Sequence, residues 1–193
     1  MIDLIKERLK SSIELKTSLL SEPKILEAVK KVVEEIVSGY KSGGKVLWCG
    51  NGGSAADAQH LAAELSGRFY YDRPPLSSEA LHVNTSYVTA VANDYSYDVI
   101  YSRLVEAMGK KGDVLMAMST SGNSPNVVKA LEAAKNKGMI TVGFTGQSGG
   151  KMKELCQYLI NIPSIDTPRI QECHMLLGHT ICELVEAGLF PKK

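Results

Sequence analysis

The chain has 193 residues, of which 22 are Lys or Arg and 21 are Asp or Glu, so its formal net charge is +1. Hydrophobic residues make up 44% and charged residues 22%, as in ordinary soluble domains, which excludes disordered, collagen-like and disulfide-scaffold classes. A near-neutral chain lacks the long-range field that would attract nucleic acid or an anionic membrane, so we expect neither as a partner. Without a signal peptide or a membrane-length apolar stretch, the sequence predicts a cytoplasmic protein with reduced cysteines.

Two helical patterns occupy the first 40 residues. In the first pattern, apolar residues recur at three- and four-residue spacing, at Ile2, Ile5, Leu9 and Ile13. The second pattern runs from about 23 to 37. Two helices alone have too few neighbours in sequence to form a separate domain. We therefore expect residues 1–193 to be a single domain, with residues 1–40 packed on it or on a neighbouring subunit.

From Gly43 onward, short apolar runs alternate with helical patterns. The runs expected to be strands are 46–49, 80–83, 114–118, 140–144 and 158–162. The helical patterns cover 54–67, 86–108, 125–137, 150–156 and about 169–188. This alternation predicts an α/β fold, with a five-stranded parallel sheet flanked by helices on both faces. Ligands of such sheets bind beyond the carboxyl ends of the strands, so the residues that follow each strand are the functional candidates.

A glycine-rich segment, Gly50-Asn51-Gly52-Gly53-Ser54, follows the first expected strand. Its spacing matches the start of a dinucleotide-binding turn, but that motif also requires an acidic residue about 20 positions later, where this chain has Tyr70. Two other interpretations remain open. The glycines serve either a tight strand-to-helix connection alone or a backbone cradle for a small polar ligand.

The third expected strand is followed by Ser119-Thr120-Ser121-Gly122-Asn123-Ser124-Pro125. Ser124 suits the N-cap of a helix, and Pro125 suits its first position. The N-terminus of a helix carries unpaired N–H groups and a partial positive charge, and four hydroxyls surround it here. We interpret the segment as a phosphate-monoester site rather than an ordinary capped turn. It lacks the G-x-x-x-x-G-K-[ST] motif of nucleoside triphosphatases.

Polar side chains also interrupt two helical patterns. His60 and Glu64 share one helix face, where they could bind a metal ion or supply a base, although spacing alone favours an ordinary surface pair. In the last helix, Gln171 and His179 lie about 12 Å apart along an ideal axis. Both would reach one site only by leaning together or at an irregular helix end. The neighbouring His174 is interpreted as structural or supporting.

Arg68, just past the helix of His60, and Asn93-Asp94, between helical segments, are further candidates for ligand contacts. Lone polar residues in loops are usually solvated, so the sequence alone does not favour a role for them.

Together these segments resemble the cytoplasmic sugar-isomerase (SIS) domain family, in which one strand precedes Gly-Asn-Gly-Gly-Ser and another precedes Ser-Thr-Ser-Gly-Asn-Ser. Further matching segments extend the resemblance over essentially the whole chain, at 57–65, 93–94, 149–152, 169–172 and His179. Within the family, the chain is similar to the branch that isomerises seven-carbon sugar phosphates.

The resemblance implies an aldose–ketose isomerase that converts D-sedoheptulose 7-phosphate to D-glycero-D-manno-heptose 7-phosphate. This enediol proton transfer is the first step toward nucleotide-activated heptose for surface polysaccharide.

The resemblance also implies one zinc ion per subunit, at residues that match His60, Glu64, Gln171 and His179. It also implies a homotetramer with sites at subunit interfaces. The implied substrate contacts are Asn51, Gly52, Gly53, Glu64, Asn93, Asp94, Ser119, Thr120, Ser121, Ser124 and Gln171. In such a site we expect Glu64 to be the base that shuttles the proton and His179 its acid–base partner on the sugar oxygens.

Two other functions remain to be weighed. A non-enzymatic branch of the family forms a similar tetramer and binds the bacterial replication initiator protein, but it lacks the acid–base pair. The presence of Glu64 and His179 favours an enzyme. A regulatory domain that binds sugar phosphates would usually be fused to a DNA-binding segment, and no basic helix-turn-helix pattern is present.

Overall fold

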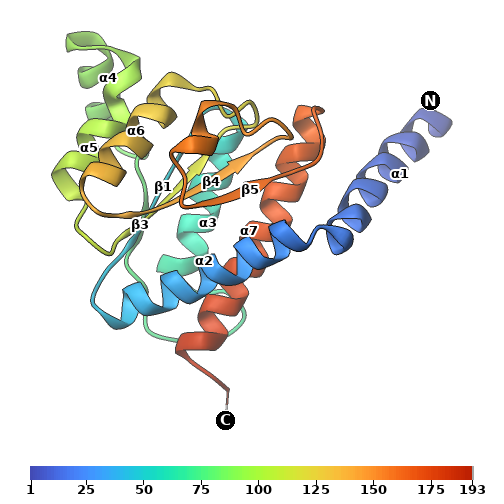
Figure 1. Cartoon of the computed structure of the whole chain (residues 1–193), viewed down its shortest axis with the longest axis horizontal. Coiled ribbons are helices and arrows are strands. Elements are labelled where there is room, and N and C mark those ends of the chain that lie inside the picture. Colours follow the sequence, from blue (N-terminus) through green and yellow to red (C-terminus); the bar gives the residue numbers. More distant parts are fainter. Residues whose placement is uncertain (193) are drawn as a thin grey trace.

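The computed structural model describes residues 1–192 as one α/β unit (Figure 1). Its elements are α1 (Ile2–Ser18), η1 (Leu19–Ser21), α2 (Pro23–Lys41), β1 (Val46–Gly50), α3 (Gly53–Ser66), β2 (Ser78–Ala80), α4 (Thr85–Asp94), η2 (Tyr97–Val99), α5 (Ile100–Met108), β3 (Val114–Met118), α6 (Pro125–Asn136), β4 (Ile140–Thr145), η3 (Gly150–Glu154), β5 (Tyr158–Asn161) and α7 (Thr167–Leu189). No helix within residues 1–192 is both long enough and apolar enough to cross a bilayer.

The five strands form one parallel sheet in the order β2-β1-β3-β4-β5. Successive side chains of a strand point to opposite faces, so Trp48 packs in one apolar layer with α2, α3 and α7, while Leu47 packs in the other with α5 and α6. Both faces of β1 and β3 are therefore buried, as their continuous apolar runs require. The predicted fold class is confirmed.

Two predicted elements differ from the structure. The second strand covers Ser78–Ala80 rather than 80–83, because the chain turns at Val83, whose N–H donates to the carbonyl of Ala80. Asn84 then caps α4 by accepting a hydrogen bond from the backbone of Tyr87. The helix predicted over 86–108 is divided into α4, η2 and α5, because Ser96 is extended and its hydroxyl accepts from the N–H of Asp98.

The N-terminal helices differ in how they meet the body. Helix α2 lies on the sheet and buries four apolar residues, Ile25, Val29, Val32 and Ile36. Helix α1 projects away from the body and buries none (Figure 1). It contacts the body through Leu15, which packs against the core, and through two hydrogen bonds: Ser12 donates to Glu172 of α7 at 2.6 Å, and Arg169 donates to the carbonyl of Arg8 at 2.8 Å. The rest of the apolar face of α1 is left exposed to solvent.

Helices α3 and α7 pack side by side and run in the same direction. Gly53 at the start of α3 meets Gln171, and Leu61 near its middle meets Gly178. A Cβ atom at Gly178 would overlap the fully buried Leu61 side chain, so glycine at this position sets how closely the two helices approach. This close approach brings side chains of α3 and α7 together over several turns.

His174 of α7 is fully buried against the end of β4. Its Nε2–H donates to the carbonyl of Thr145 at 3.1 Å, since a carbonyl can only accept, and its ring packs edge-on against Phe144. This position agrees with the structural role expected for His174.

We expect His174 to make the folded protein sensitive to acid. Burial lowers the pKa of His174 to about 4, and the hydrogen bond to Thr145 offsets only part of this shift. Between pH 6.5 and 4 the unfolded chain therefore binds a proton that the folded chain does not, so the free energy of unfolding falls as the pH drops through this range. The loss from this group reaches about 3 kcal/mol.

Urea unfolding at several pH values between 7 and 4 measures this effect. His174→Gln keeps a donor for Thr145 but does not titrate, so its stability should depend less on pH than that of the wild type. The same dependence in both proteins would contradict the assignment.

Candidate active site

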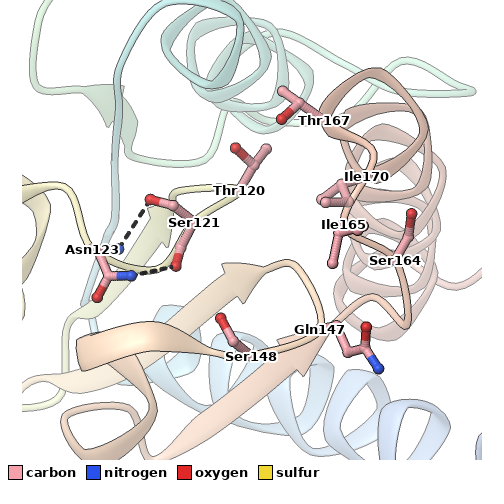
Figure 2. A pocket seen from close by; sticks show the side chains of 9 residues that line it. All are labelled: Thr120, Ser121, Asn123, Gln147, Ser148, Ser164, Ile165, Thr167 and Ile170. Atoms are coloured by element: carbon pink, nitrogen blue, oxygen red, sulfur yellow. Dashed lines mark hydrogen bonds between the residues drawn. The ribbon is translucent and has the colours of Figure 1, made fainter.

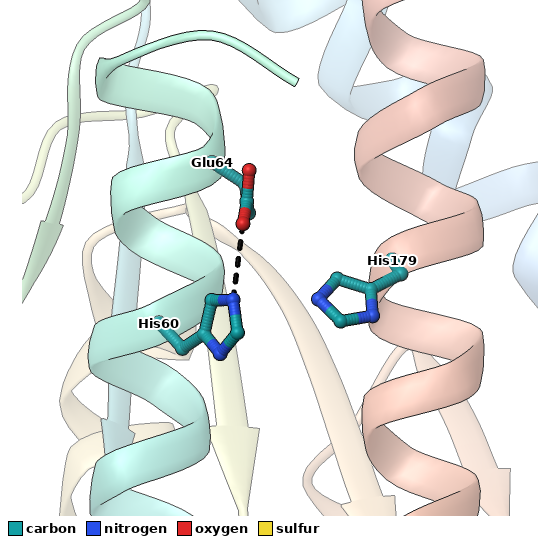
Figure 3. Close-up of side chains that lie close together, drawn as sticks. All are labelled: His60, Glu64 and His179. Atoms are coloured by element: carbon teal, nitrogen blue, oxygen red, sulfur yellow. Dashed lines mark hydrogen bonds and ion pairs between the residues drawn. The ribbon is translucent and has the colours of Figure 1, made fainter. Parts of the chain in front are cut away.

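Three side chains capable of binding a metal ion converge between α3 and α7: His60, Glu64 and His179 (Figure 3). Their ligand atoms all lie within 4.8 Å of one another, and His60 Nε2 lies 3.0 Å from Glu64 Oε1. The rings of His60 and His179 are 5.1 Å apart between centroids. Two imidazoles and a carboxylate are ligands that suit zinc and similar divalent ions. We call these three residues the triad.

The helix geometry explains why the triad forms. His60 and Glu64 are one turn apart on α3 and so share a face. His179 follows Gly178, whose missing side chain lets α7 lie against Leu61. The triad remains open to solvent, because the side chains of His60 and Glu64 are 53% and 24% exposed.

Asp57 lies on the same face of α3 and was not among the predicted site residues. It precedes Glu64 by seven residues, and its Oδ2 atom is buried without a hydrogen-bond partner within the described residues. Burial raises the pKa of Asp57 above its usual value, and the nearby His60 offsets only part of this rise. The seven-residue spacing from Glu64 was the sequence signal that could have identified it.

Gln171 lies beside the glycine turn within the chain. A Cβ at Gly53 would come within 2.5 Å of Gln171 Nε2, so the side-chain amide rests directly on this backbone. Helix α7 is continuous from Thr167 to Leu189, so the irregular helix end considered from the sequence is not present. His60 and His179 lie about two turns further along their helices.

The glycine turn is held by a reciprocal pair of side-chain amides. Asn51 Nδ2 donates to Asn126 Oδ1 at 2.8 Å, and Asn126 Nδ2 donates back to Asn51 Oδ1 at 2.9 Å. Tyr97 also donates to Asn51 Oδ1, at 3.1 Å. Since Asn126 follows Pro125, this pair joins the glycine turn to the serine-rich segment. Gly52, in the same turn, has φ of 56° and precedes α3.

The serine-rich segment forms the turn between β3 and α6, with Ser124 at the N-cap and Pro125 at the first helical position, as predicted. The Ser124 side chain does not cap the helix; its hydroxyl lies 3.0 Å from that of Ser119, which also lies 3.4 Å from that of Ser121. A hydroxyl cluster thus stands at the N-terminus of α6.

Beside this turn lies a cavity of about 510 Å³ (Figure 2). Its walls come from three loops at the carboxyl edge of the sheet and from the start of α7, through Thr120, Ser121, Asn123, Gln147, Ser148, Ser164, Ile165, Thr167 and Ile170. None of these lining residues is basic, so an anion here would be held by hydroxyls, amides and backbone N–H groups. Figure 2 shows the hydroxyls of Thr120 and Ser121 on the side of this space opposite Ile165.

The structure does not bring all predicted site residues together in one chain. Asn93 and Asp94 are exposed in the last turn of α4, where Asn93 donates to Asp94 at 2.9 Å, and Arg68 is exposed in the loop after α3. Ile170 lines the cavity, whereas His179 lies nine residues later, about 13 Å along the α7 axis. The cavity and the triad are thus two separate parts within one subunit.

Comparisons with known proteins agree on the family. The SIS domain model matches residues 14–146. Phosphoheptose isomerase from Aneurinibacillus thermoaerophilus is 50% identical over 193 residues, covering 100% of this chain and 98% of the relative, and that from Clostridium acetobutylicum is 49% identical with the same coverage. The solved structure of phosphoheptose isomerase GmhA from Neisseria gonorrhoeae has a TM-score of 0.89 at 39% identity, covering 96% of this chain and 98% of that one. The chain therefore belongs to the SIS domain family and, within it, to the phosphoheptose isomerases.

Proposed function

We propose that the protein is an aldose–ketose isomerase that converts D-sedoheptulose 7-phosphate to D-glycero-D-manno-heptose 7-phosphate, the first step toward nucleotide-activated heptose. The observation that carries this proposal is the convergence of His60, Glu64 and His179 from two helices. The names of relatives that are half identical over the full chain support it. A cytoplasmic location, where sugar phosphates are made and consumed, is part of the same proposal.

The reaction moves a carbonyl group between C1 and C2 of the sugar. A base takes a proton from C1, next to the carbonyl, to form an enediol, and the base, after exchanging this proton with solvent, delivers a proton to C2. In our proposal the Glu64 carboxylate carries this proton. Its Oε1 contacts His60, which fixes the orientation of the carboxylate. His179 exchanges the second proton between the O1 and O2 oxygens.

The triad fits the zinc ion that the family implies, because its donor atoms are two imidazole nitrogens and a carboxylate oxygen. His60, Glu64 and His179 would hold the metal, and Gln171 is proposed as a further ligand. When bound, zinc supplies Lewis-acid polarisation of the sugar oxygens.

The serine-rich turn is proposed to bind the phosphate, through Ser119, Thr120, Ser121, Ser124 and the N–H groups of α6. Binding energy gained there would position the reacting end of the sugar. Asn51, Gly52, Gly53, Asn93, Asp94 and Gln171 are proposed to contact the sugar hydroxyls.

A homotetramer with sites at subunit interfaces completes the proposal. The separation of about 13 Å along α7 between cavity and triad is one argument. The other is the exposed apolar face of α1, where Ile5 and Leu9 are 53% and 60% exposed and line a groove of about 540 Å³. The adaptor alternative is less favoured, because an adaptor needs no triad and the relatives compared above are named as isomerases.

An NMR assay with sedoheptulose 7-phosphate in D₂O tests the function. We expect the wild type to form the aldoheptose phosphate with deuterium at C2, a chelator to stop turnover, and zinc to restore it. Glu64→Gln should lower turnover by at least about 100-fold while the fold is retained, since it removes the proposed base.

Glu183→Gln is the matched control, because Glu183 is an exposed carboxylate one turn beyond His179 on α7. Its turnover should equal that of the wild type. A fully active Glu64→Gln protein would disprove the role of Glu64, and zinc-loaded wild type without product or exchange would disprove the function.

The serine-rich turn is tested by Ser124→Ala and Ser121→Ala. Each removes a hydroxyl donor to a charged group, an interaction of about 1.5–3 kcal/mol, so we expect KM for the sugar phosphate to rise roughly 10- to 100-fold. Because the triad is unaltered, kcat should change less. Ser42→Ala, at the exposed end of α2, is the control. An unchanged KM in both the Ser124→Ala and the Ser121→Ala protein would refute the phosphate site.

The assembly is tested by light scattering of the purified chain. We expect a mass four times that of one chain, and dissociation in Ile5→Glu/Leu9→Glu, because charges would replace an apolar contact. Lys10→Glu, on the solvated side of α1, should remain tetrameric. A monomeric wild type at micromolar concentration would rule out the tetramer.

A further inference from the structure

A buried ion pair lies between α7 and the end of α3, next to the backbone of Glu64. Arg73, from the loop after α3, donates through Nε to Glu186 of α7 at 3.0 Å. The two side chains are only 2% and 1% exposed. A buried ion pair is weak evidence for stability by itself, because removing two charges from water offsets much of their attraction. The direction of its other hydrogen bonds indicates what this pair does.

The remaining donors of Arg73 point mainly at the end of α3, apart from a hydrogen bond of Nη1 to the carbonyl of Pro74 in its own loop. Its Nη2 donates to the carbonyl of Glu64 at 2.8 Å, and its Nη1 donates to the carbonyls of Leu65 at 2.8 Å and Gly67 at 3.0 Å. The last carbonyls of a helix have no partners within the helix. One planar guanidinium therefore closes the final turn of α3, and that turn carries Glu64.

The Glu186 carboxylate acts on the facing side of the triad. Its two oxygens accept hydrogen bonds from the backbone N–H groups of Phe69 at 2.9 Å and Tyr70 at 2.8 Å. The ring of Phe69 lies 5.8 Å from that of His179, between centroids. Glu186 follows His179 by two turns of α7, so it anchors the loop that packs against His179.

The charge state of Glu186 suits this role. Burial alone would raise the pKa of Glu186, but hydrogen bonds from Phe69, Tyr70 and Arg73 outweigh it, and the pKa lies below its usual value. The carboxylate is therefore ionised at neutral pH and binds all three donors.

We propose that Arg73 and Glu186 are positioning residues of the isomerase site, which hold the last turn of α3 and the Phe69 loop in fixed register with α7 so that Glu64 and His179 meet. This inference rests on the function proposed above. Neither residue touches the triad side chains; each acts through the backbone or through Phe69. Small displacements of catalytic groups are costly, since a shift of about 1 Å can cost roughly 100-fold in rate.

Two variants test the proposal. Arg73→Met/Glu186→Leu removes both charges, so that no unpaired buried charge remains, and Arg73→Lys keeps the charge but loses the planar fork. At a temperature where circular dichroism shows a folded protein, we expect kcat to fall about 10- to 100-fold with KM little changed. The affinity for zinc alone, measured by competition with a chelating dye, should fall at least about 10-fold.

The matched control is a second ion pair, whose residues make no hydrogen bond to the triad or to Arg73 within the described chain. Asp113, which is buried just before β3, accepts from Lys45 Nζ at 2.6 Å and from the backbone of Lys110 at 2.8 Å. Asp113→Asn should lower the melting temperature without changing kcat or zinc affinity.

The outcomes separate the two claims. If the Arg73 variants lose only stability, with kcat and zinc affinity like those of Asp113→Asn, the pair is merely structural and the inference is overturned. If the wild type has no isomerase activity, the proposed function fails, whereas the zinc affinities still decide whether the pair positions the triad. Wild-type zinc affinity in both Arg73 variants would overturn the positioning role in that case as well.

Discussion

The close parallel packing of α3 against α7 is the constraint on which the rest of the site depends. Gly178 permits it, because a larger residue would overlap Leu61. From that contact the two helices remain adjacent in both directions. Toward their N-termini, Gln171 reaches the backbone at Gly53; toward their C-termini, Glu186 binds the loop that follows α3. The triad lies between these two points. A change in helix separation would therefore alter the glycine turn, the triad and the buried ion pair together.

The parallel sheet also bears on how a chain of net charge +1 would hold the phosphate group in the proposed site. It has no general positive field, so attraction must be local. Parallel strands end at one edge, where β3 delivers its serine-rich turn to the N-terminus of α6. There the Ser119, Ser121 and Ser124 hydroxyls cluster beside a cavity whose lining residues include no basic side chain. Hydroxyl groups and unpaired N–H groups at the N-terminus of a helix favour the binding of a phosphate group.

How far the sequence predicts this structure depends on whether a feature is local. The strands β1 and β3 and the start of α6 at Ser124-Pro125 depend on residues that are adjacent in the sequence, and they were predicted correctly. The second strand was misplaced because the apolar run continues to Val83, although the strand ends at Ala80 and the chain turns there. Pairings between distant residues leave no such local signal. The convergence of Glu64 with His179 came only from the resemblance, and the contact of Arg73 with Glu186, 113 residues away, was not predicted at all.

Exposure divides the site into two kinds of residues. His60 and Glu64 are partly open to solvent, whereas Arg73 and Glu186, which support them, are nearly inaccessible. Buried supports fix the backbone without competing with substrate for hydrogen bonds, and this leaves the triad side chains free to change partners during a reaction. Closing the site would nevertheless protect the reactive enediol from side reactions. A single subunit leaves the triad uncovered, and its α1 presents an apolar face that no part of the described chain covers. The chemistry and the exposed helix therefore both favour the proposed homotetramer, in which another copy of the chain would enclose the site.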